Sequence, residues 1–181
     1  MPKVRTTGFH AWTEGEIEKF ERRWNLGTRE RLALAIFLYS GLRRGDAAGL
    51  GRQHIRDGSI WVRTAKTSTP LVLPILPELQ RAIDATPTGD LAFIVSSKSG
   101  KPMTKESFGN WFSDACRVAG VPGSAHGLRK AGARRAAENG ATQAQLRAIY
   151  GWSNDATAAI YIRDADRALL ARDGMAKLSK R

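Results

Sequence analysis

The apolar residues near the start of the chain recur with the period of an α-helix. Thr13-Glu14-Gly15-Glu16 has the arrangement of a capping box, in which the Thr hydroxyl and the second Glu carboxylate satisfy free backbone amides, so a helix is expected to run to about Trp24. Thr28 is placed to cap a second helix. Residues 32–38 are apolar throughout, so we expect this helix to form the buried centre of the fold, ending before Gly41.

The middle of the chain changes to the pattern of β-strands. Residues 59–63 and 70–75 are rich in apolar and β-branched side chains and are bounded by turn-forming residues, which predicts two paired strands. Pro70 and Pro74 cannot donate ladder hydrogen bonds, and this favours a small sheet with exposed edges. Residues 91–95 are a short apolar run that could form a third extended piece.

The rest of the folded chain has helical periodicity with caps and stop signals. The expected segments are a turn at 46–50, helices at 77–85, 104–119, 126–139, 142–151 and 164–178, and a short segment at 155–163 that carries Tyr161. Residues 1–11 show no period and are expected to be a flexible lead-in or linker. The prediction is one domain over 12–181, mainly α with a small antiparallel β-sheet (α+β).

The charge balance favours a polyanionic partner. The 181 residues include 29 Lys and Arg against 17 Asp and Glu, which gives a formal net charge of +12 at pH 7. Nucleic acid and an anionic membrane both fit that charge, but no predicted helix has a clustered basic face of the kind that binds membranes. With no apolar run near the ~20 residues of a membrane span and no signal peptide, a cytosolic protein is expected.

The single cysteine is expected to be structural. Cys116 lies on one helical stripe with Phe108, Phe112 and Ala115, and no second cysteine exists for an internal disulfide. We therefore predict a buried thiol at this position rather than a nucleophile.

Several residues suited to phosphodiester chemistry stand near predicted helix ends. Cleavage of a phosphodiester needs a nucleophile, cations that hold the non-bridging oxygens and an acid for the departing oxygen. Arg43 and Arg129 suit the clamp, since a guanidinium is permanently charged and donates two parallel hydrogen bonds. Tyr161 is the candidate nucleophile, and His126 and Lys66 are the candidates for proton transfer.

Two further residues complete this set. The Trp152 indole can only donate a hydrogen bond, either to a phosphate oxygen or as part of the packing beneath the site. Asp46 stands three residues after Arg43. Taken singly, each of these side chains would more often be a core aromatic, a helix cap or a surface charge, so their joint order and spacing carry the prediction.

That order resembles the catalytic domain of the tyrosine recombinases, the phage integrase family, over residues from about 10 to 178. The motifs are Ser40-Gly41-Leu42-Arg43 followed by Asp46, Lys66 between two strands, His126-Gly127-Leu128-Arg129 at a helix start, and Gly151-Trp152 nine residues before Tyr161.

The resemblance implies a site-specific DNA recombinase of a phage or other mobile element. Tyr161 would attack a scissile phosphate to form a 3′-phosphotyrosine and free a 5′-hydroxyl, with no metal, ATP or other cofactor. Arg43, Arg129 and Trp152 would hold the phosphate, His126 would assist proton transfer, Lys66 would protonate the leaving oxygen and Asp46 would support the site. The implied partner is double-stranded DNA, bound by four protomers, with a monomer in isolation, in the bacterial cytoplasm at the nucleoid.

Two departures from the family pattern matter. Most members carry His where this chain has Trp152, which removes an acid-base group but keeps a hydrogen-bond donor. Members also have an N-terminal DNA-clamp domain for which these residues leave no room, so the chain is expected to be an excised domain or a natural short form with weak, salt-dependent DNA affinity. The helix at 164–178 is expected either to dock on a neighbouring protomer or to fold back on its own domain.

Two other functions stay open at this level. A type IB topoisomerase uses the same Tyr, Arg and Lys chemistry to relax DNA without exchanging partners. A non-catalytic DNA-binding relic would keep the basic surface with an idle site.

Overall fold

The computed structural model describes residues 10–163, 165 and 167–178. The expected lead-in at 1–11 therefore lies almost wholly outside the described residues, as does the expected start of the last helix at 164. Within the described residues the fold is mainly helical with one small antiparallel sheet, which confirms the predicted fold class.

The first helices begin at the caps that the sequence predicts. In α1 (Glu14–Arg23) the Thr13 amide donates to a carboxylate oxygen of Glu16 at 2.8 Å, and the Glu16 amide donates to the Thr13 hydroxyl at 3.2 Å. Thr28 caps α2 (Arg29–Ser40), which ends at Gly41 in the left-handed conformation with φ 61°. Every residue from 32 to 38 is buried, so α2 is the centre of the fold.

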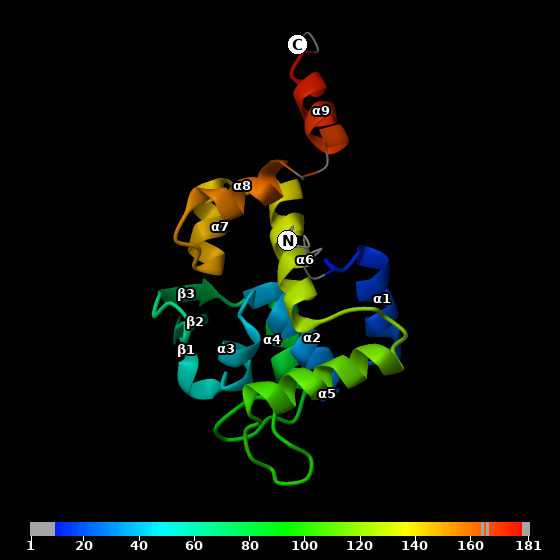
Figure 1. The fold of residues 1–181 in the computed structure, drawn as a ribbon, viewed down its shortest axis with the longest axis vertical. Helices are drawn as coiled ribbons and strands as arrows, with labels where there is room; N and C mark the ends of the chain where they lie inside the picture. Colours follow the sequence, from blue (N-terminus) through cyan, green and yellow to red (C-terminus); the bar gives the residue numbers. More distant parts are fainter. Residues whose placement is uncertain (1–9, 164, 166, 179–181) are drawn as a thin grey trace, which may run out of the picture.

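Several of the other helices pack against α2, while the last one projects away from it (Figure 1). The bounds of the remaining helices are as follows. They are α3 (Arg44–Ala48), the 3-10 helix η1 (Arg52–His54), α4 (Pro77–Ala85), α5 (Lys105–Val118), α6 (Ala125–Glu138), α7 (Gln143–Tyr150), α8 (Asp155–Arg163) and α9 (Arg167–Ala176). Within the described part of the chain, none of the helices combines the length and the apolar character that crossing a membrane requires.

The sheet has the strand order β1-β2-β3, with β1 (Ile55–Arg56), β2 (Ser59–Arg63) and β3 (Pro70–Pro74). Trp61 pairs with Val72, and β3 with its two prolines is an edge strand, as expected. The third strand of the sheet is β1, and the expected third extended piece at 91–95 is reduced to Val95, which forms an isolated β-bridge with Pro102. The middle of this segment packs into the core, where Phe93 and Ile94 are buried and the Phe93 amide donates to the Leu50 carbonyl at 2.8 Å, while Leu91 is exposed.

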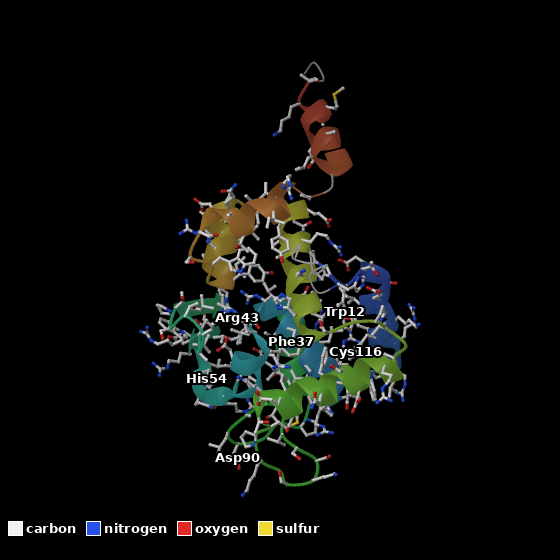
Figure 2. All side chains as sticks on the ribbon, in the orientation of Figure 1. Trp12, Phe37, Arg43, His54, Asp90 and Cys116 are labelled. Atoms are coloured by element: carbon white, nitrogen blue, oxygen red, sulfur yellow. The ribbon has the colours of Figure 1, made fainter. Side chains whose placement is uncertain are left out.

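Two apolar clusters hold the elements together. The larger one contains α2 and α5 and includes Phe37 and Cys116, which Figure 2 shows among these helices. Cys116 is 1% exposed, which confirms the predicted buried thiol, and burial raises the pKa of this thiol to about 12, which disfavours the reactive thiolate. The smaller cluster joins the end of α6 to α7 and α8 around Leu146 and Tyr150.

The last helix stands apart from both clusters. Figure 1 shows α9 projecting away from the body of the molecule beyond α8. Its apolar side chains Leu170 and Met175 are exposed. Folding back of this helix on its own domain, one of the two expected arrangements, is therefore not what the structure has.

Candidate active site

Arg43 follows directly after the end of the central helix. Gly41 closes α2 in the left-handed conformation, and a Cβ there would also collide with the ring of Tyr150. The chain then turns so that Arg43 caps α3 with extended backbone. In the view of Figure 2 its side chain lies between the body of the fold and α7.

One nitrogen of Arg43 is an orphan. Among the residues that the structure describes, Nη1 of Arg43 is a buried side-chain nitrogen with no hydrogen-bond partner. A buried N–H of a charged group costs free energy when it is unpaired, and an anion in front of it would remove that cost. The arrangement therefore favours binding of a negatively charged ligand.

Arg129 is the buried cation of the site. It lies in the first half of α6. Ser124 caps this helix, which begins at Ala125, one residue before the predicted start. The side chain is 6% exposed and donates from Nη1 to the carbonyl of Gly41 and from Nη2 to the carbonyl of Tyr150, the latter at 2.5 Å. Because these carbonyls end α2 and α7, the guanidinium joins two helix C-termini, where a cation is stabilised.

The environment of Arg129 lowers the pKa of its guanidinium, but the group stays protonated at pH 7. Burial and, next, the charge of Arg43 lower the pKa of Arg129 to about 10, against smaller opposing effects of Tyr150, Tyr161 and Asp46. The group is therefore still a cation at pH 7. Two guanidinium groups that repel each other in this way are both stabilised when an anion binds between them.

Asp46 contacts the β2–β3 hairpin loop that carries Lys66. Asp46, on α3, accepts a hydrogen bond from the backbone amide of Ala65 at 2.8 Å. Lys66 is the next residue and is exposed on the hairpin loop. The carboxylate thus holds the loop that carries the lysine. This hydrogen bond is the contact through which Asp46 would play its predicted supporting role.

His126 lies on the first turn of α6 and retains access to solvent. Desolvation lowers the pKa of His126, and the charges of Lys130, Arg129 and Arg43 lower it further. The imidazole is consequently neutral at pH 7 and able to accept a proton.

These residues surround one pocket of about 650 Å³. Five of the predicted site residues line it, namely Arg43, Asp46, Lys66, His126 and Arg129. Lys105 of α5 also lines this pocket and was not predicted, since a lone lysine at a helix start looks like any surface charge.

The two predicted aromatic residues lie beside this pocket rather than in its wall. Tyr161, on α8, is half-buried and stacks on Trp152 with ring centroids 5.2 Å apart and ring planes 8° apart. The guanidinium carbon of Arg129 is 5.9 Å from the centre of the Trp152 ring. Burial raises the pKa of the Tyr161 phenol, and the charge of Arg129 partly offsets that effect. Arg129 therefore links the cationic pocket to the aromatic pair.

Comparison with known proteins relates this chain to DNA recombinases. The model of the phage integrase family matches residues 14–168. No curated protein sequence matches the chain significantly.

Solved structures share the fold. A lambda integrase dimer bound to a COC′ core site has a TM-score of 0.73 at 23% identity, covering 92% of this chain and 51% of that one. A lambda integrase tetramer bound to a Holliday junction has a TM-score of 0.69 at 20% identity, covering 86% and 51%. XerA recombinase has a TM-score of 0.72 at 19% identity, covering 100% and 68%. The chain thus spans about half the length of these lambda integrase chains.

Proposed function

Because this chain belongs to the phage integrase family, we propose that it is a site-specific DNA recombinase that cleaves and rejoins DNA through a 3′-phosphotyrosine intermediate. The observation that carries the proposal is the orphan nitrogen of Arg43 in a pocket shared with Arg129, His126 and Lys66. Residues 12–181 act as the catalytic domain.

The cationic pocket receives the scissile phosphate. Arg43 offers its unpaired Nη1 to one non-bridging oxygen, and Arg129 supplies the second buried charge. Oriented donors of this kind are each worth roughly 10²–10³ in rate, because they are already in place when charge develops on the phosphate.

The bonds made and broken balance without a cofactor. The Tyr161 oxygen forms a bond to phosphorus, the bond from phosphorus to the 5′-oxygen breaks, and the phenolic proton passes to His126. Lys66 gives a proton to the departing 5′-oxygen. The Tyr161 phenol approaches the phosphate from beside the pocket, where its ring stacks on Trp152. Attack of another 5′-hydroxyl on the phosphotyrosine reverses these steps and reseals a strand.

Double-stranded DNA is the partner in this proposal. The net charge of +12 suits a polyanion. Lambda integrase has been solved as a dimer on core-site DNA and as a tetramer on a Holliday junction, and we extend a tetramer on DNA to this chain, with a monomer in isolation. A cytoplasmic place beside the nucleoid follows from the same partner.

The direct test is metal-free formation of a protein–DNA adduct. The protein is incubated in EDTA and low salt with supercoiled plasmid that carries the DNA flanking its gene, and is then separated on a denaturing gel. We expect a covalent adduct whose modified peptide contains Tyr161. Plasmid relaxation without strand exchange between two sites would instead indicate a topoisomerase, and absence of any adduct, also with a longer natural form of the protein, would indicate a relic.

A pH profile tests the role of His126. The histidine must be neutral to accept the phenolic proton, so the cleavage rate should fall with acidification. Since the pKa of His126 is lowered from 6.5, the midpoint of that fall should lie below 6.5. Single-turnover cleavage between pH 5 and 8 measures it.

The matched control for that profile is His126→Gln. Glutamine keeps hydrogen bonding but does not titrate, so the variant should be slower and should lose the acidic limb. An unchanged limb in this variant would assign the proton to another group.

A further inference from the structure

Tyr150 contacts both Arg129 and Trp152 of the proposed site, although no step of the proposed reaction uses it. It is the last residue of α7 and is 3% exposed. The sequence offered one signal that was not used, namely an aromatic residue directly before the Gly151-Trp152 pair.

The ring of Tyr150 forms one end of an aromatic stack. Its centroid is 4.8 Å from that of Trp152 with the planes 19° apart, and Trp152 stacks in turn on Tyr161. Gly151 between them has φ 61° and ψ 38°, a left-handed conformation that reverses the chain so that both rings stack. The indole of Trp152 is thus held between two phenol rings.

The same residue also contacts the buried arginine. The guanidinium carbon of Arg129 lies 5.0 Å from the centre of the Tyr150 ring, within the range of a cation–π interaction, and Nη2 donates to the Tyr150 carbonyl at 2.5 Å. Tyr150 therefore connects a phosphate-binding side chain to the stack that ends at the nucleophile.

Two glycines, Gly41 and Gly132, allow backbone to approach the Tyr150 ring closely. A Cβ on Gly41 would overlap the ring, and a Cβ on Gly132 would lie 2.9 Å from the phenolic oxygen. Because backbone from α2 and α6 approaches so closely, the Tyr150 ring has little room to move.

We propose that Tyr150 is a positioning residue, whose ring fixes the Trp152 indole and, through it, the orientation of the Tyr161 phenol relative to Arg129. Its catalytic consequence rests on the proposed function, but its structural consequence does not. A nucleophile held in one orientation reacts faster, and small misplacements cost about 10²-fold in rate.

Two variants separate the ring from the rest of the residue. Tyr150→Phe keeps the aromatic face, and Tyr150→Leu removes it. Both keep the backbone carbonyl that receives the Arg129 hydrogen bond. Tyr150→Met is a second non-aromatic variant with a longer and more flexible side chain, for use if the Leu variant unfolds.

The structural arm uses the protein without DNA. The chain has three tyrosines, so the ring signals of ¹³C-tyrosine-labelled protein can be assigned with single Phe variants. In the wild type and in Tyr150→Phe, the ring current of the indole should shift the Tyr161 ring protons upfield. In Tyr150→Leu that shift should decrease.

The kinetic arm uses single-turnover cleavage at saturating DNA. Tyr150→Leu should be slower by about 10–100-fold with an unchanged Kd for DNA, whereas Tyr150→Phe should keep most of the rate. A Leu variant with the wild-type Tyr161 shift and rate would overturn the proposal, as would equal losses in Phe and Leu. If the wild type forms no adduct, the proposed function fails and the spectrum alone decides the positioning role.

Discussion

Tyr161→Phe is expected to abolish the covalent protein–DNA adduct, with a loss of at least about 10³-fold in cleavage rate. The variant keeps the ring that stacks on Trp152 at 5.2 Å but lacks the oxygen that must bond to phosphorus. Binding should therefore persist while chemistry stops. Adduct formation on labelled DNA and the Kd for the same DNA, measured at one salt concentration, test the two effects separately.

Tyr39→Phe is the matched control for this experiment. Tyr39 belongs to α2, its ring lies 6.0 Å from the guanidinium carbon of Arg135, and it is not part of the pocket lining. This variant should form adduct at the wild-type rate. An adduct that survives in Tyr161→Phe and is lost in Tyr39→Phe would contradict the assignment of the nucleophile.

Arg129→Ala is expected to damage both activity and stability. Cleavage should fall by about 10²–10³-fold, because an oriented cation at the phosphate is lost. The free energy of unfolding should also fall, by about 2–4 kcal/mol, since the carbonyls of Gly41 and Tyr150 lose their donor inside the protein. Denaturant unfolding measures the second effect and single-turnover cleavage the first.

Arg43→Ala separates these two effects. It should lose cleavage to a similar extent, but its free energy of unfolding should stay the same or rise by up to about 1 kcal/mol, because the variant removes an unpaired buried nitrogen. It also removes the neighbouring charge that lowers the pKa of Arg129. Equal destabilisation in both variants would contradict the view that only Arg129 joins the helix ends.

Arg43 and Arg129 belong both to the proposed site and to the packing of the fold. Arg129 stabilises the fold by binding the C-termini of α2 and α7, and this places its charge next to Arg43. The repulsion between the two is tolerated in the unbound protein and is relieved by an anion. Phosphate binding and the packing of the helices are therefore expected to support each other.

Local features of the fold were predictable from the sequence. The capping boxes at Thr13 and Thr142 and the stop at Gly41 involve residues within a few positions of one another, so their physics is visible in the sequence alone. The order of the motifs from Arg43 to Tyr161 was likewise sufficient to predict the family and the fold class. The site roles of these residues remain predictions for the experiments above.

Other features were not predictable because they depend on contacts between distant segments. Strand β1 is two residues long and exists through its pairing with β2, so it has no pattern of its own. The apolar run at 91–95 has the pattern of a strand, but its buried residues Phe93 and Ile94 pack into the core, and the Phe93 amide donates to the Leu50 carbonyl.

The sequence by itself determined which residues are available for the chemistry and which helices and strands carry them. Only the tertiary structure decided that Arg129 donates to carbonyls 88 and 21 positions away, that one Arg43 nitrogen has no partner among the described residues, and that Tyr150 completes the aromatic stack. The physical reason is that helix caps and strand patterns arise from neighbours along the chain, whereas burial, pairing of charges and ring stacking arise from neighbours in space.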